Sequence, residues 1–154
     1  MDQFLPTIIL RHRKENLKKC SLRGLEKRSD IRFYSYPLAE EQPDLSAYVV
    51  LSMDGPPLTA NDRDKGIFLI DGTWRYAEKM GRSIHGPNLV RSLPSVRTAY
   101  PRKQEDCPDP TRGLASVEAL YLAYMILGRN TDGLLDHYYW KEEFLAIIEA
   151  CQPA

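Results

Sequence analysis

An acidic residue, a glycine, a hydroxyl and an indole come directly after a short apolar run in this chain of 154 residues. The run is Ile67–Ile70, and Asp71, Gly72, Thr73 and Trp74 follow it. A short apolar run bounded by turn residues is typical of a strand buried on both faces of a parallel sheet. A strand, an acidic turn and a helix form the arrangement at which open α/β sheets bind ligands. Asp71 is therefore a candidate catalytic residue; the alternative is that Asp71 and Thr73 only cap the helix and that Trp74 fills the core.

Four further segments have residue types that suit a ligand site. They are Lys18–Ser21, Leu51–Asp54, Arg91–Pro94 and Leu114–Ala119. These segments offer small residues, backbone donors and an apolar wall. That combination fits a nucleoside-type cofactor better than a metal ion.

Several common enzyme and protein classes lack support in the sequence. No Gly-x-Gly-x-x-Gly follows a strand, and neither a P-loop nor a Gly-x-Ser-x-Gly elbow occurs. The three histidines are isolated and no Cys/His spacing matches a zinc site, so we expect no metal. Three widely spaced cysteines argue against a disulfide framework and for a reducing, cytoplasmic setting. No apolar run has the length of a membrane span, and the first residues do not resemble a signal peptide.

The net charge of zero hides an asymmetry along the chain. Residues 11–32 include nine basic and three acidic residues, a net charge of +6. Residues 103–149 include four basic and nine acidic residues, a net charge of −5. A basic segment of this kind indicates a polyanion-binding face, although a solvated helix face is the alternative. The candidate RNA-binding residues are Arg11, Arg13, Lys14, Lys18, Lys19 and Arg23.

The elements that must position these residues follow from local patterns. Apolar and β-branched runs predict strands at residues 7–10, 31–34, 48–51, 67–70 and 96–99. Helical periodicity and caps predict helices at residues 17–27, from 74 to about 80, at 117–127 and at 139–151. We expect turns at residues 52–57 and 89–94, and a long loop at residues 100–112. Strands alternating with helices indicate one α/β domain, residues 1–154, with a mostly parallel sheet.

Four of the segments together resemble a known family. Asp71–Trp74 matches the D-x-[TS]-W motif of the DTW-domain proteins, and Leu114–Ala119 is similar to their L-S-[TC]-x-E-A segment. Lys18–Leu25 is similar to the K-K-C-[ST]-x-x-x-L segment of the ribosomal RNA aminocarboxypropyltransferases, and Arg91–Pro94 resembles their R-L-L-P. The segments occur in the family's order, and the resemblance is closest to the enzymes of small-subunit ribosomal RNA.

This resemblance implies a fold and an activity. The fold is a single-domain SPOUT-like α/β fold, in which residues 1–66 carry the basic segment and residues 67–154 form a part with a C-terminal trefoil knot. The activity is transfer of the 3-amino-3-carboxypropyl group from S-adenosylmethionine to a uridine or pseudouridine-type base. DTW proteins that act on tRNA usually carry a cysteine-rich N-terminal segment, which this chain lacks, so ribosomal RNA is favoured as the partner.

Three other functions stay open at this point. They are a DTW-type tRNA uridine aminocarboxypropyltransferase, a SPOUT RNA methyltransferase with the same cofactor, and a non-catalytic RNA-binding ribosome-assembly factor. For each we expect a monomer or weak homodimer that binds RNA and neither a metal nor a membrane.

The resemblance also implies roles for individual residues. Ser21 would hold the carboxylate of S-adenosylmethionine, and Asp71 would pair with its amino group or accept the proton of the base nitrogen. The implied cofactor-binding residues are Ser21, Leu51, Ser52, Met53, Asp71, Trp74, Leu93, Leu114, Ala115 and Ser116. Taken singly, the apolar residues Leu51, Met53 and Leu93 are also explained as ordinary core.

The chain departs from the family pattern at several positions. Ser21 stands where Thr is usual, Met53 where Pro is usual, and Ala115 where Ser is usual. The family's N-P-x-N-Y-G loop has no clear counterpart near Tyr100. The cofactor side of the resemblance therefore carries over better than its RNA-binding loop.

Overall fold

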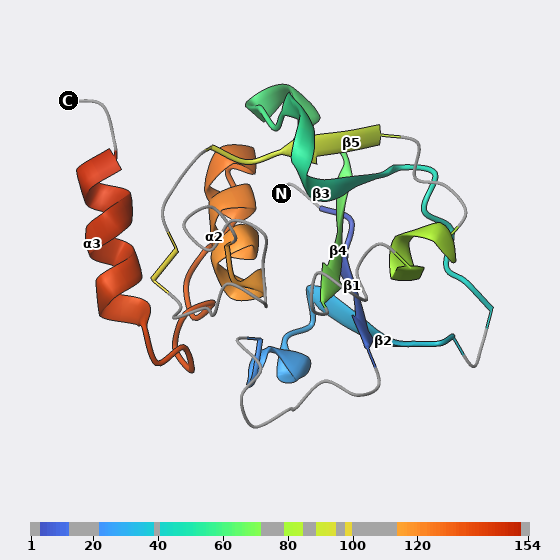
Figure 1. The fold of residues 1–154 in the computed structure, drawn as a ribbon, viewed down its shortest axis with the longest axis horizontal. Helices are drawn as coiled ribbons and strands as arrows, with labels where there is room; N and C mark the ends of the chain where they lie inside the picture. Colours follow the sequence, from blue (N-terminus) through green and yellow to red (C-terminus); the bar gives the residue numbers. More distant parts are fainter. Residues whose placement is uncertain are drawn as a thin grey trace.

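The computed structural model describes residues 4–12, 22–38, 41–71, 79–84, 89–94, 98–99 and 114–151. Within these ranges five parallel strands form one sheet in the order β2-β1-β4-β3-β5 (Figure 1). The strands are β1 Thr7–His12, β2 Ile31–Tyr36, β3 Tyr48–Pro57, β4 Gly66–Asp71 and β5 Leu89–Ser92. The helices are α2 Ser116–Leu127 and α3 Lys141–Cys151, with 3₁₀ turns η1 Leu25–Lys27 and η2 Ala60–Asp62. The expected α/β class with a mostly parallel sheet is confirmed.

The central strands are apolar on both faces because both faces are covered. Successive side chains of a strand point to opposite sides. Ile9 and Leu69 accordingly join the core on the α2 side of the sheet, whereas Ile8, Leu10 and Phe68 join a second cluster on the other side. The continuous apolar runs of β1 and β4 follow from this double burial.

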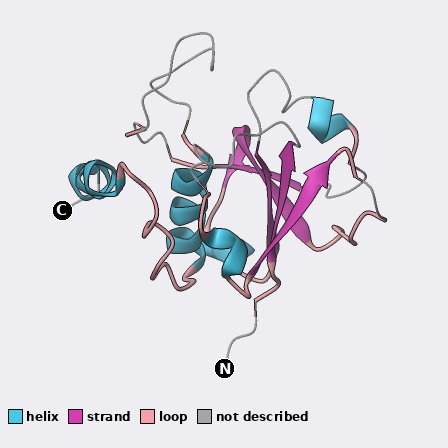
Figure 2. Cartoon of the chain, turned by 90° about the horizontal axis from the view of Figure 1, so that it is seen from below, coloured by secondary structure: helices cyan, strands magenta, loops and turns pink. Residues whose placement is uncertain are grey.

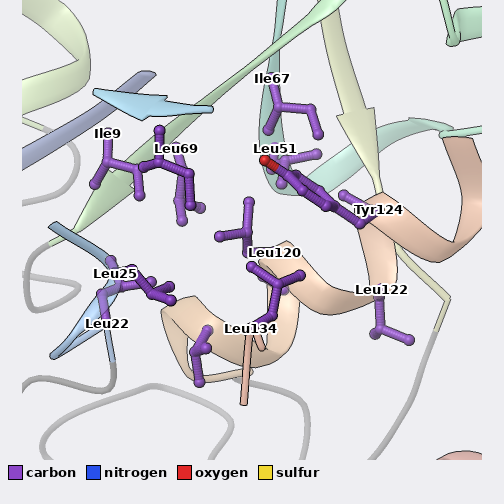
Figure 3. Packing of buried hydrophobic residues seen from close by; sticks show 14 of the residues in the cluster. Ile9, Leu22, Leu25, Leu51, Ile67, Leu69, Leu120, Leu122, Tyr124 and Leu134 are labelled. Atoms are coloured by element: carbon purple, nitrogen blue, oxygen red, sulfur yellow. The ribbon is translucent and has the colours of Figure 1, made fainter. Parts of the chain in front are cut away.

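Helix α2 lies directly on one face of the sheet, and α3 packs on the outer side of α2 (Figures 1 and 2). Leu120 is fully buried and lies among Ile9, Leu69 and Leu134 (Figure 3). Tyr121 of α2 meets Phe144 of α3 edge to face, with ring centroids 6.0 Å apart. Two helical layers therefore lie on this side of the sheet, and α2 is the inner one (Figure 2).

The opposite face of the sheet has a smaller core. Met80, which is fully buried, belongs to a helical stretch at residues 79–82 and packs with Ile8, Leu10 and Phe68. Leu45 closes the same cluster from the segment before β3. No helix in the described ranges is both long and apolar enough to span a membrane.

The expected helix at residues 17–27 is wrong in its described part. Residues 22–24 form a turn, and η1 covers only Leu25–Lys27. Gly24 has a φ of 92°, a left-handed conformation that interrupts a right-handed helix. The apolar periodicity of this segment instead reflects Leu22 and Leu25, which both pack into the core.

Two expectations about strands are also wrong. The fifth strand is Leu89–Ser92, where we expected a turn, whereas Thr98 and Ala99 lie outside any strand. Leu89–Ser92 becomes a strand because its backbone pairs with β3, a long-range contact that local pattern does not reveal. Strand β3 likewise continues through the expected turn to Pro57, with a bulge in which Ser52 and Pro57 both pair with Ser92.

The other elements agree with expectation to within a few residues. Helix α2 ends at Gly128, whose φ of 72° makes the left-handed cap predicted there. The C-terminal trefoil knot stays a prediction, since residues 100–113 lie outside the described ranges.

Candidate functional site

The carboxyl ends of β1 and β4 form the topological switch point of the sheet. The chain continues from β1 to β2 at one side of this pair and from β4 to β5 at the other side. Open α/β sheets bind ligands outside the strand ends at such a point. Arg11 near the end of β1 and Asp71 at the end of β4 are register partners there. The structure thus places Asp71 where the sequence predicted a ligand site.

Asp71 is buried and accepts hydrogen bonds from two other elements. Its Oδ2 accepts from Nε of Arg11 at 3.3 Å, and its Oδ1 accepts from Oγ of Ser116 at 2.8 Å. Only 5% of the residue is exposed. These contacts fix the carboxylate between β1 and the first residue of α2.

Arg11 links Asp71 to a second acid. Its Nη1 donates to Oε2 of Glu26 at 3.1 Å, and its guanidinium carbon lies 4.3 Å from the ring centroid of Phe33. Partial burial favours a higher pKa for Glu26, but hydrogen bonds from its own backbone N–H, from Arg11 and from Gly24 outweigh burial and lower that pKa. Glu26 is therefore ionised at neutral pH.

The cluster of Glu26, Arg11, Asp71 and Ser116 contains two acids and one base. We call it the switch-point cluster. Its formal charge is −1, and 11% of the Arg11 side chain, 7% of the Asp71 side chain and 41% of the Glu26 side chain are accessible to solvent. An excess of negative charge suits a cationic group, such as an ammonium or a sulfonium, better than an anion.

The start of α2 is fixed by Glu118, which sequence reasoning did not single out. Glu118 is fully buried, and its carboxylate accepts from Ala115 N–H at 2.8 Å, Ala99 N–H at 2.9 Å, the Tyr138 hydroxyl at 2.9 Å and the Thr98 hydroxyl. The signal was its place as the third residue of α2, where a Glu bonds back to the N-cap backbone. Glu118 therefore holds Ser116 in position opposite Asp71.

The apolar candidates gather on the α2 side of the sheet. Leu51 is a buried member of that core, and the half-buried Leu93 and Leu114 pack against the same cluster. Ala115 is buried beside them as the N-cap of α2. The structure therefore brings these residues together, in a place where core packing also explains them.

Ser52 and Met53 lie at the bulge of β3. Ser52 pairs with Ser92 of β5, whose hydroxyl donates to the carbonyl of Gly55 at 2.9 Å and fastens the bulged segment. Bulges of this kind are frequent next to active sites, where they redirect the chain. The side chain of Met53 lies outside the described residues.

Several predicted site residues are outside the described ranges, so their roles stay predictions. They are Ser21 and Trp74 of the cofactor set and Arg13, Lys14, Lys18 and Lys19 of the RNA set. Of the two described members of the RNA set, Arg23 is exposed, whereas Arg11 belongs to the switch-point cluster. Among the described residues, no group of three or more His, Cys, Asp or Glu side chains could hold a metal ion.

Comparison with solved structures gives a clear likeness. The chain is similar to the solved structure of the SAM-dependent rRNA:acp-transferase Tsr3 from Vulcanisaeta distributa, with a TM-score of 0.70 and 24% sequence identity. The alignment covers 95% of this chain and 80% of that one. No family model matches the chain. No curated protein matches it either. The likeness to Tsr3 shows that the two chains share a fold.

Proposed function

We propose that this protein transfers the 3-amino-3-carboxypropyl group from S-adenosylmethionine to a uridine-type base of ribosomal RNA. The observation that carries the proposal is the position of Asp71. This residue lies at the switch point of a sheet that shares its fold with Tsr3, described as a SAM-dependent rRNA acp-transferase. The order of the four family-like segments supports the same activity.

The residues at the switch point fit the cofactor in charge. S-adenosylmethionine carries a sulfonium, an ammonium and a carboxylate, a net charge of +1, and the switch-point cluster carries −1. Asp71 would pair with the ammonium, because a buried carboxylate favours a cationic partner. The bound cofactor supplies a carbon activated by the adjacent sulfonium.

The remaining candidates would hold the rest of the cofactor. Leu51, Leu93 and Leu114 would supply apolar surface for the adenine, and Met53 and Trp74 would add to that surface. Ser21 would hold the carboxylate. Ala115 and Ser116 complete the site at the start of α2.

The basic segment would hold the RNA. Arg13, Lys14, Lys18, Lys19 and Arg23 would contact phosphates, which accounts for the excess of positive charge in residues 11–32. Ribosomal RNA is proposed over tRNA because the similar structure Tsr3 is described as an rRNA:acp-transferase. The SPOUT-like knot and a monomer or weak homodimer belong to the same proposal.

The test uses two forms of labelled cofactor. The purified protein is incubated with small-subunit ribosomal RNA lacking the modification and with S-adenosylmethionine labelled either in the carboxyl carbon or in the methyl group. We expect the carboxyl label to enter the RNA and the methyl label to stay with the adenosine-containing remainder of the cofactor. The mass of the modified nucleoside isolated from the RNA then identifies the transferred group.

Other outcomes would assign the alternatives. Transfer of the methyl label would indicate a methyltransferase, and transfer into tRNA alone would indicate the DTW-type activity. RNA binding without any cofactor-dependent rise in melting temperature would indicate a non-catalytic factor, since a ligand that binds only the native state must stabilise it.

A further inference from the structure

Arg11 was expected to contact RNA, but its surroundings indicate a different task. We propose that Arg11 is a positioning residue, which holds the Asp71 carboxylate in place at the switch point and does not contact RNA phosphates. This inference rests on the proposed function, because it assigns a role within the proposed cofactor site.

The first support is the register of the sheet. Arg11 and Asp71 lie opposite each other in the parallel pair β1–β4, so their side chains leave the sheet at the same level. The Arg11–Asp71 contact is therefore determined by the pairing of the adjacent strands β1 and β4. No loop has to move to form it.

The second support is that the guanidinium is held from three directions within the protein. Its Nε donates to Asp71, its Nη1 donates to Glu26, and its plane lies over the ring of Phe33. Only 11% of the side chain is exposed. A guanidinium so enclosed presents little surface to a phosphate, in contrast to the exposed Arg23.

The third support is the geometry of the side chain itself. The guanidinium is a planar fork with donors on different nitrogens, so one arginine bridges two carboxylates on β4 and η1. A lysine ammonium is a single point charge on a flexible stem and reproduces a phosphate contact better than it reproduces this bridge. Replacing Arg11 by lysine should therefore impair the positioning of Asp71 but would preserve a phosphate contact, so this substitution distinguishes the two roles.

The experiment compares Arg11→Lys, Arg11→Gln and Arg23→Gln in the full chain. For each variant we measure cofactor affinity by calorimetry, single-turnover transfer, and RNA affinity as a function of salt. For Arg11→Lys we expect transfer at saturating cofactor to fall about 10-fold to 100-fold, the cost of a misplaced group in a site. The slope of RNA affinity against salt should stay at the wild-type value for both Arg11 variants.

The Arg23→Gln variant provides the matched contrast, because it removes one positive charge from the same basic segment. Loss of one phosphate contact should reduce the salt slope by about 0.7 to 0.9. Cofactor affinity should be unchanged in this variant. The Arg11 variants would then change transfer but not the salt slope, whereas Arg23→Gln would change the salt slope but not cofactor affinity.

Phe33→Leu keeps every charge and removes the aromatic ring beneath the guanidinium, while leucine can still pack against the core that Phe33 adjoins. It covers the case in which the Arg11 variants do not fold. Like Arg11→Lys, it should lower the rate of transfer and leave the slope of RNA affinity against salt unchanged. Wild-type transfer in both Arg11→Lys and Phe33→Leu, or a salt slope in Arg11→Gln reduced as in Arg23→Gln, would overturn the inference. Failure of the wild-type protein to bind cofactor would instead refute the proposed function.

Discussion

At the scale of the residue, the orientation of the Asp71 carboxylate depends on the groups around it. Both carboxylate oxygens are engaged, one by a guanidinium and one by a hydroxyl. A carboxylate held in this way has a defined orientation. Such a group suits the recognition of a cofactor ammonium as well as the acceptance of a proton, and a single substitution tests whether it takes part in transfer.

Asp71→Asn removes the charge while preserving size. An amide has one acceptor oxygen, so it accepts from Arg11 or from Ser116 but not in the same way from both. We expect transfer to fall by roughly a hundredfold or more, the range for a positioned acid–base group. Stability should fall by about 1–3 kcal/mol from one unmet hydrogen bond.

Single-turnover kinetics at saturating cofactor measure the effect on transfer, and denaturant unfolding measures the effect on stability. Ser116→Ala, which removes only the hydroxyl donor, serves as the comparison and should have a smaller effect on transfer. Near-normal transfer by the Asp71→Asn variant would show that Asp71 is only part of the scaffold.

At the scale of the element, the start of α2 depends on Glu118. One carboxylate gathers the Ala115 backbone, the segment Thr98–Ala99 and the Tyr138 hydroxyl from the connection before α3. Three parts of the chain therefore meet at the end of the helix that faces Asp71. Because Glu118 is fully buried, these hydrogen bonds replace those that its carboxyl oxygens would make with water.

Glu118→Gln should destabilise the protein by about 2–6 kcal/mol. Each carboxylate oxygen accepts from two donors and the amide keeps only one acceptor oxygen, so two of the four donors lose their acceptor, at about 1–3 kcal/mol each. Denaturant unfolding monitored by the tryptophan and tyrosine signal gives the difference. Glu143→Gln, an exposed substitution in α3, is the control and should change stability by less than about 0.5 kcal/mol. Equal effects of the two substitutions would contradict the role given to Glu118.

At the scale of the whole molecule, the side of the sheet at which the parallel strands end and the side at which they begin have different roles. The carboxyl edge carries the switch-point cluster, whereas the amino edge carries a compact polar group around Asp30. Arg28 contacts both oxygens of Asp30 at 2.9 and 3.0 Å, and the Tyr124 hydroxyl lies 3.3 Å from Oδ2. The same hydroxyl shares a 2.7 Å hydrogen bond with Thr7, so this group joins β1, β2 and the far end of α2.

The amino edge should make stability depend on pH. Hydrogen bonding to Arg28 lowers the pKa of Asp30 from its usual value of 3.8, although partial burial opposes the change. A carboxyl whose pKa is lower in the folded state stabilises the protein above its unfolded pKa, and this contribution is lost as the pH falls through the folded pKa. The Asp30 contribution is therefore present at neutral pH and disappears below pH 3.8.

Denaturant unfolding of the wild type and of Asp30→Asn at a series of pH values measures this dependence. We expect the wild type to be more stable at neutral pH and the two proteins to converge as the solution becomes more acid. A difference in stability that stays constant over the whole range would show that Asp30 contributes through its shape and not through its charge.

The parts of the fold that the sequence predicted well are those with a local cause. The strand at residues 67–70, the helix at residues 117–127 and the stop at Gly128 depend on apolar runs, periodicity and a permissive glycine. The place of Asp71 at a strand end follows from the same run. Neighbours in the sequence are enough to determine these features.

The parts that only the tertiary structure decided depend on residues far apart in the chain. Leu89–Ser92 is a strand because β3 pairs with it, and Glu118 is important because Thr98, Ala99 and Tyr138 fold back onto it. A basic segment read as a run of charges indicated that all its members face RNA. The parallel register placed Arg11 beside Asp71, sixty residues away, and enclosed it between two acids and an aromatic ring. Register between distant strands follows from how whole faces of the sheet are buried, and no local pattern contains that information.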